Sequence, residues 1–294
     1  MGLTLGPGVR PEAPSRSLFW QRDAVSPVAA RVMGMALERT TLAAATSKLA
    51  ADAAGRRQKR VVFVNAHVVN SAWRDASYWE TVADADMRLA DGSGLAIAAR
   101  LAGTPLPDNV NGTDMLPLLC REATVRGQRI FLLGGVPGAA ERTAHTMAAH
   151  GGPGTIAGHH HGYFAHDSAE EAEVIARINA SGASILLVGF GVPVQDTWIA
   201  RNAARLDARV LIGVGGLFDF YSGRVSRAPM LLRKLGLEWT WRLAQEPQRM
   251  WRRYIIGNVV FLGRAAACAM QARVAGPDRA SHADGPQADR ITAA

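Results

Sequence analysis

The chain has 294 residues, of which 48% are hydrophobic, so it can bury a full core and is not disordered as a whole. Its two cysteines, Cys120 and Cys268, lack a Cys-x-x-Cys spacing, which is typical of a reducing compartment and argues against a zinc site. The first thirty residues have no apolar leader core, and the apolar run 254–263 is too short for a bilayer, so no membrane span is expected.

The formal net charge of +8 is concentrated in one segment. Residues 224–264 hold nine Lys or Arg against Glu238 and Glu246, a net charge of +7, whereas residues 265–294 balance three Arg against three Asp. A basic segment of this kind attracts phosphates, carried by nucleic acid, anionic lipid or a phosphorylated substrate. An anionic partner is therefore expected at this end of the chain.

The amino-terminal region is predicted to begin with a disordered segment and to continue with a strand, a helix and a second strand. Residues 1–30 are rich in Pro, Ser and Arg without periodicity and are predicted to be a disordered lead-in. A short strand is predicted at 31–35, and Thr40 or Thr41 is the expected N-cap of the alanine-rich helix that follows. The apolar run 61–64 is the next predicted strand.

Two polar residues in the first half of the chain are candidates for function. Asn65 directly follows the strand 61–64, where its amide either holds a ligand or caps the next helix. Segment 78–90 has a helical pattern and leads to Asp91, whose carboxylate lies in a glycine-flanked turn before another helix. By position alone Asp91 fits an N-cap better than a catalytic group, and both hypotheses stay open.

Three motifs suggest a metal ion or a cofactor, but none is typical of such a site. Asp84-Ala85-Asp86 matches the Asp-x-Asp of many nucleotide-sugar enzymes but lies in a helical pattern, and the consecutive histidines 159–161 point to opposite sides of an extended segment. The glycine-rich turn 134–138 lacks the Gly-x-Gly-x-x-Gly fingerprint of dinucleotide enzymes. We expect no metal and no other cofactor.

The strongest ligand-binding signal comes from two strand-to-loop units. An apolar strand at 184–188 precedes the loop 189–193 and a helix that begins at Gln195, and the strand 209–212 ends at Gly213-Val-Gly-Gly216. Glycines let the backbone approach a ligand, and the carboxyl ends of parallel strands are where α/β sheets bind ligands. The repeated alternation of strand and helix predicts an α/β fold with a mostly parallel, Rossmann-like sheet covered by helices on both faces.

The pattern changes after Pro229. Residues 230–264 are predicted to form a basic amphipathic helical appendage on a core that spans 31–229, and residues 265–294 are predicted to be a disordered tail. Trp239, Trp251 and Tyr254 stand beside arginines, a combination that suits a bilayer interface. The alternative is a helical pair packed on the domain.

Together, several motifs resemble the WecG/TagA/CpsF family of bacterial glycosyltransferases over residues 31–260. The motifs are Asn65-Ala66, Ala90-Asp91-Gly92, Gly112-Thr-Asp114, Phe131-Leu-Leu-Gly-Gly135, His161-Gly-Tyr-Phe164, Gly189-Phe-Gly-Val-Pro-Val-Gln195-Asp196, Gly213-Val-Gly-Gly-Leu-Phe-Asp219, Gly223-Arg-Val-Ser-Arg-Ala-Pro229, Gly236-Leu-Glu-Trp-Thr-Trp-Arg-Leu243 and Glu246-Pro-Gln-Arg249.

The resemblance implies an inverting, metal-independent transfer from a UDP-sugar donor to a polyprenol-diphosphate-linked acceptor at the inner face of the cytoplasmic membrane. It implies that Asp91 is the general base, that Asn65 and Gln195 line the nucleotide-sugar pocket with the loop that holds Gly215 and Gly216, and that appendage arginines stabilise the leaving group. The matching arginines are Arg242, Arg249 and Arg252.

The sequence departs from the family pattern at Phe63, where Thr is common, at Asn109, where a basic residue is common, and at Asp196, where Glu is usual. The donor is therefore left open between N-acetylmannosamine, glucose and another hexose. The competing hypotheses are a nucleotide-dependent oxidoreductase and a non-catalytic module that binds nucleotide or anionic lipid. We expect an anionic membrane surface as partner and no nucleic acid, and a homo-oligomer is left open.

Overall fold

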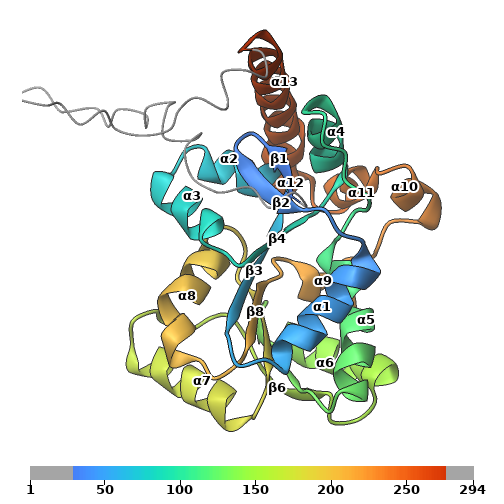
Figure 1. The fold of residues 1–294 in the computed structure, drawn as a ribbon. Coiled ribbons are helices and arrows are strands. Elements are labelled where there is room, and N and C mark those ends of the chain that lie inside the picture. Colours follow the sequence, from blue (N-terminus) through green and yellow to red (C-terminus); the bar gives the residue numbers. More distant parts are fainter. Residues whose placement is uncertain (1–28, 276–294) are drawn as a thin grey trace, which may run out of the picture.

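A six-stranded sheet forms the centre of the molecule in the computed structural model, which describes residues 29–275 (Figure 1). Its strand order is β4-β3-β8-β7-β5-β6, and every neighbouring pair is parallel. The strands are β3 (Lys59–Val64), β4 (Met87–Ala90), β5 (Ile130–Gly134), β6 (Ile156–His160), β7 (Ile185–Gly189) and β8 (Val210–Gly213). The predicted parallel α/β sheet is confirmed.

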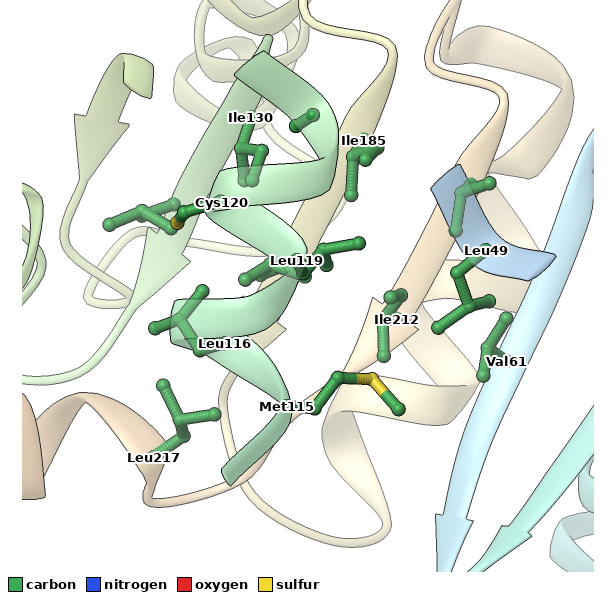
Figure 2. Packing of buried hydrophobic residues seen from close by; sticks show 14 of the residues in the cluster. Leu49, Val61, Met115, Leu116, Leu119, Cys120, Ile130, Ile185, Ile212 and Leu217 are labelled. Carbon is green, nitrogen blue, oxygen red and sulfur yellow. The ribbon is translucent and has the colours of Figure 1, made fainter. Parts of the chain in front are cut away.

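Alternation along the strands builds a core on each face of this sheet. In β3, Val61 and Phe63 join one buried cluster while Val62 and Val64 join another, because successive side chains of a strand point to opposite faces. Figure 2 shows part of the first cluster, where Ile130, Ile185 and Ile212 of three strands meet the helix that carries Leu116 and Leu119. The strands are therefore buried on both faces, as a parallel sheet requires.

Helices cover both faces, as predicted. One face carries α1 (Leu42–Ala53), α5 (Gly112–Val125), α6 (Ala139–Gly151) and α9 (Leu217–Tyr221). The other carries α7 (Ala169–Ala180) and α8 (Val194–Asn202), which is followed by the 3-10 turn η2 (Ala203–Arg205), together with α2 (Ala66–Ala72), α3 (Ala76–Ala83) and α4 (Ser93–Leu101).

A chain of helices forms the carboxyl-terminal appendage and gathers at one end of the molecule with α4 (Figure 1). It comprises α10 (Met230–Lys234), α11 (Glu238–Gln245), α12 (Pro247–Trp251), one π turn η3 (Arg252–Ile256) and α13 (Gly257–Ala275). Phe261 and Ala265 of α13 are buried in the cluster that α2 and α4 also build. The predicted helical appendage is present and is packed on the core along part of α13.

The predicted tail boundary at 264 is wrong, because α13 continues through residues 265–275. Ala265 lies in the core, and packing of this kind stabilises a helix that composition alone does not predict. At the other end the predicted lead-in 1–30 overlaps the first strand, which starts at Ala29. The remainder of both predicted disordered segments lies outside the described residues.

Two local predictions are corrected and a third is confirmed. The strand expected at 31–35 is a hairpin of β1 (Ala29–Val32) and β2 (Met35–Glu38), which turns at residues 33–34 with positive φ angles. The helix expected over 78–90 stops at Ala83, and its last four residues form the edge strand β4 because they pair with β3. Thr41 is the N-cap of α1, as one alternative had it.

Ion pairs and hydrogen bonds tie the appendage to the core. Asp114 of α5 accepts bonds from Arg227 and Arg233, each at 2.7 Å. Burial pushes the pKa of Asp114 upward, but the bonds and charges of these arginines outweigh it and the pKa is lowered. Asn70 of α2 donates to the carbonyl of Gly257 at 2.7 Å and accepts from Arg264 at 3.0 Å.

The expectation that no segment is long enough to span a membrane is also corrected. Within the 26-residue helical segment Pro247–Ala272, an 18-residue stretch has a mean hydropathy of 1.4 and is 11% buried, which by length and composition suffices for a span. In this chain Phe261 and Ala265 of the same segment pack into the core.

Candidate active site

A cavity of about 290 Å³ lies at the carboxyl ends of β3, β4 and β8, and the appendage forms its opposite wall. This position follows from the rule that open α/β sheets bind ligands where parallel strands end. Of the eight predicted site residues, the cavity brings together seven, which are Asn65, Asp91, Gln195, Gly215, Gly216, Arg242 and Arg249.

Asn65 and Asp91 meet because of strand register. Val64 pairs with Ala90 across the parallel strands β3 and β4, so the residues that follow them lie side by side. The Asn65 Oδ1 atom accepts from the backbone N–H groups of His67 and Val68 at 3.1 Å, which caps α2. This cap turns the Asn65 Nδ2 atom toward Asp91, to whose Oδ2 it donates at 3.4 Å. Asn65 therefore caps α2, as one alternative predicted, and it also lines the cavity.

The Asp91 side chain is not a helix cap. The N-cap of α4 is Gly92, with φ at 95°, and no side chain caps this helix. Burial raises the pKa of Asp91 to about 6, while the Asn65 bond and the charge of Arg253 oppose the rise. A carboxylate with a pKa near neutrality that faces a cavity is suited to accept a proton.

Gln195 and the glycine loop form a second side of the cavity. The Gln195 Oε1 atom accepts from the N–H of Gly215 at 2.7 Å, so a buried side chain of α8 holds the loop that follows β8. Gly215 has φ at 56°, a conformation that glycine adopts without strain. A Cβ atom on Gly216 would lie 3.6 Å from the Arg242 guanidinium, an ordinary van der Waals contact, so the arginine lies directly beside the loop.

Arginines of the appendage form the wall opposite Asp91. Arg242 is only 6% exposed and lies over the Phe220 ring at 4.8 Å. Its guanidinium pairs with Glu246 at 2.7 Å and with Asp219 at 3.4 Å, yet its Nη1 atom is buried without a hydrogen-bond partner. An unused buried donor is costly, so this group suits an anionic ligand.

Arg249 completes this wall from α12. Its side chain is 60% exposed and pairs with Glu246 at 3.0 Å, while Asp219 lies at 3.9 Å. Exposure leaves Arg249 free to change partners when a ligand enters, since exposed ion pairs are weak.

Arg252 does not line the cavity, and this part of the sequence prediction is not met. Its guanidinium lies over the Trp251 ring at 5.3 Å. Arg253 lines the cavity instead, with Arg233 from α10. Arg253 follows Arg249 by four residues, and residues spaced by four share a helix face. That spacing is the sequence signal that was overlooked.

Sequence reasoning also missed His67, Trp239 and Tyr254, which line the cavity. Burial, with the charges of Arg253 and Arg74, lowers the pKa of His67 to about 4, so the ring is neutral at physiological pH. The rings of Trp239 and Tyr254 lie 6.2 Å apart. Both aromatic residues had been assigned to a bilayer interface, but here they face the cavity.

The motifs that were discounted as metal sites lie outside this cavity. Asp86 accepts bonds from the Arg60 backbone at 2.9 Å and from Arg57 at 3.2 Å, so it anchors the start of β3. His160 belongs to β6, at the far edge of the sheet from β4. Within residues 29–275, no three His, Cys, Asp or Glu side chains are grouped to hold one metal ion.

The glycine-rich turn after β5 serves packing. A Cβ on Gly134 would lie 2.6 Å from the carbonyl oxygen of Gly189, because the two strands end close together. This turn does not line the cavity, which removes the feature on which the oxidoreductase hypothesis was built.

Comparison with known proteins agrees with the geometry. The sequence pattern of the glycosyl transferase WecG/TagA/CpsF family matches residues 30–275. Relatives from Staphylococcus aureus strains MRSA252, MW2 and NCTC 8325 bear the name N-acetylglucosaminyldiphosphoundecaprenol N-acetyl-beta-D-mannosaminyltransferase. Each is 30% identical to this chain over 192 residues, which cover 65% of this chain and 74% of the relative. The chain belongs to the WecG/TagA/CpsF family of glycosyl transferases.

Proposed function

We propose that this protein is an inverting glycosyltransferase that moves a hexose or an N-acetylhexosamine from a UDP-sugar to a polyprenol-diphosphate-linked acceptor in cell-surface polysaccharide biosynthesis. The observation that carries the proposal is one cavity lined both by a carboxylate of raised pKa and by arginines of the appendage. The Staphylococcus aureus relatives, by their name, use a diphosphoundecaprenol acceptor, which supports the acceptor class.

The proposed chemistry is a single displacement. The Asp91 carboxylate takes the proton of the acceptor hydroxyl as that oxygen forms a bond to the anomeric carbon of the donor sugar. The bond from the anomeric carbon to the diphosphate oxygen breaks on the opposite face, so UDP leaves with the electron pair and the configuration inverts. Asn65 holds the carboxylate toward the cavity by its 3.4 Å bond.

Arginines are proposed to stabilise the departing diphosphate without a metal ion. The buried Nη1 atom of Arg242 has no partner within the described residues, and Arg249 and Arg253 lie on the same wall. Three guanidinium groups that bind phosphate oxygens can supply the charge that a divalent ion supplies elsewhere. We expect turnover in excess EDTA to equal the untreated rate, and a loss of activity that magnesium or manganese restores would contradict this.

We further propose that the protein works on the inner face of the cell membrane as a peripheral protein. Leu231 of α10 and Leu235, which follows this helix, are 68% and 62% exposed beside basic residues, a combination that suits an anionic lipid surface. The buried side of α13 at Phe261 and Ala265 favours a helix that lies on the surface over one that crosses the bilayer. The acceptor lipid would then meet the cavity at this end of the molecule.

A panel of UDP-sugars tests the function. UDP-N-acetylmannosamine, UDP-N-acetylglucosamine and UDP-glucose are each incubated with the protein and an N-acetylglucosaminyl-diphosphate lipid, and products are separated by mass. We expect one donor to give a product heavier by one sugar, with inverted anomeric configuration. Failure of every donor, together with no binding of UDP, would contradict the proposal and favour a non-catalytic lipid-binding protein.

A further inference from the structure

A buried carboxylate beside the cavity has no role in the proposed displacement. Asp196 of α8 is 3% exposed, and no Lys, Arg or His in the described part of the chain forms an ion pair with it. Its bonds come from the Tyr78 hydroxyl, at 2.6 Å, and from the Gln195 Nε2 atom, at 3.4 Å. Burying a carboxylate without a cation is costly, and burial raises its pKa to about 6. Stability alone does not account for this residue.

The bonds of Asp196 determine which way the Gln195 amide faces. An ionised carboxylate only accepts hydrogen bonds, so the Nε2 atom of Gln195 must face Asp196. The Oε1 atom then faces the glycine loop and accepts from the N–H of Gly215 at 2.7 Å. With the amide reversed, its NH₂ group would face that N–H, and two donors would oppose each other.

The glycine loop is built around this arrangement. A Cβ atom on Gly213 would overlap both the Asp196 carboxylate and the Gln195 amide, so only glycine fits there. Gly215 and Gly216 line the cavity next to Arg242. A chain of bonds therefore runs from Tyr78 on α3 through Asp196 and Gln195 to the loop.

We propose that Asp196, supported by Tyr78, is a positioning residue that fixes the Gln195 amide and, through it, holds the loop 213–216 in the form that binds the diphosphate of the nucleotide donor. This inference rests on the proposed function, because it concerns how the donor side of that site is shaped. Asp196 touches neither donor nor acceptor in this scheme and acts through Gln195 alone.

The experiment compares Asp196→Asn with the unaltered protein by calorimetric binding of UDP and by steady-state kinetics. An asparagine can present its NH₂ group to Gln195, which then reverses and leaves the Gly215 N–H without an acceptor. We expect the Kd for UDP and the KM for the donor to rise about tenfold while kcat changes by less than about threefold. Asp196→Glu retains an acceptor-only group and should restore part of the affinity.

Glu171→Gln is the matched control. Glu171 of α7 is a buried carboxylate that accepts at 2.7 Å from Trp198, which lies on α8 with Asp196, and neither Glu171 nor Trp198 lines the cavity. This variant should lower the melting temperature and leave the affinity for UDP unchanged. If it weakens UDP binding as much as Asp196→Asn does, general loosening of α8 explains the effect and the inference is wrong.

A double variant tests the route through Gln195. On a Gln195→Ala background, Asp196→Asn should cause no further loss of UDP affinity, because the group it positions is gone. The same additional loss on both backgrounds would overturn the inference.

A second variant, Tyr78→Phe, serves if Asp196→Asn does not fold. It removes one hydrogen bond to the Asp196 carboxylate and should weaken UDP binding about threefold. Unchanged UDP affinity in this variant would overturn the inference. Unaltered protein that binds no UDP would refute the proposed function itself.

Discussion

At the scale of single residues, Asp91 is held where its charge is unfavourable. Its pKa in the folded protein, about 6, lies above the ordinary value of 3.8 because the carboxyl is buried. A raised carboxyl pKa means that the fold prefers the protonated form, so its stabilising contribution is complete below the unfolded pKa and is lost as pH rises through the folded one. Stability is thus given up at the residue proposed to act as base.

Asp91→Asn is therefore expected to stabilise the protein near neutral pH. The neutral amide resembles the protonated carboxyl, so the free energy of unfolding should rise by about 1 to 3 kcal/mol at about pH 7.5 and by much less near pH 4. Urea unfolding at both pH values measures this. Asp207→Asn, at an exposed aspartate, is the control and should change stability little at either pH. Destabilisation by Asp91→Asn at about pH 7.5 would contradict the argument.

The same pKa sets the pH dependence of turnover. A base must be ionised in the free enzyme, so kcat/KM should rise with pH through about 6 and level off at higher pH. Steady-state kinetics at subsaturating donor and acceptor between about pH 5 and about pH 8 give this profile. A kcat/KM that does not vary over this range would exclude Asp91 as the group whose ionisation limits the rate.

At the scale of elements, the sequence predicts those parts of the site that directly follow an apolar strand. The strand before Asn65 and the glycine loop at 213–216 are visible as apolar runs that end in polar or glycine residues. Strand β4 was missed because its four residues continue a helical pattern, and only pairing with β3 makes them a strand and places Asp91 beside Asn65. Long-range pairing of this kind overrides local propensity.

The appendage shows the other limit of sequence reasoning. Its basic charge was evident, but which arginine faces the cavity depends on helix phase. The chain breaks between α11 and α12 at Glu246, so helix phase cannot be carried from Arg242 to the arginines that follow. Within the later segment, the spacing of four from Arg249 indicates Arg253, which lines the cavity, whereas Arg252 does not.

Three alanine variants test this selection. Arg249→Ala and Arg253→Ala should each lower kcat by about a hundredfold or more, because each removes a cation facing the diphosphate, while binding to liposomes is largely kept. Arg252→Ala is the matched control on the same helical segment and should leave kcat nearly unchanged. Equal losses of kcat for Arg252→Ala and Arg253→Ala would mean that the assignment of the wall is wrong.

At the scale of the whole molecule, the basic segment that carries a net charge of +7, residues 224–264, also supplies part of the cavity lining. The same segment presents the exposed side chains of Leu231 and Leu235. This asymmetry would orient the protein on an anionic bilayer with its cavity toward the lipid acceptor. The core would then contribute Asp91 and the glycine loop, and the appendage would contribute both the arginines for the diphosphate and the surface that meets the membrane.

The double substitution Leu231→Ser and Leu235→Ser is expected to weaken binding to anionic vesicles several-fold and to leave UDP binding intact. Both side chains are exposed, so the fold has little reason to change, whereas interfacial burial is lost. Co-sedimentation with vesicles measures the effect. Val125→Ser, at an exposed position on α5 outside the appendage, is the control and should not alter it. Undiminished sedimentation of the double variant would place the membrane contact elsewhere.

The most direct test of the central claim is to measure UDP binding and sugar transfer side by side for Asp91→Asn. The substitution keeps the size of the side chain and removes its ability to accept a proton. We expect UDP affinity to stay within about threefold of the unaltered protein, while transfer to the lipid-diphosphate acceptor falls by roughly two to four orders of magnitude. Transfer at a near-normal rate would contradict the claim that Asp91 is the base of a glycosyl transfer in this cavity.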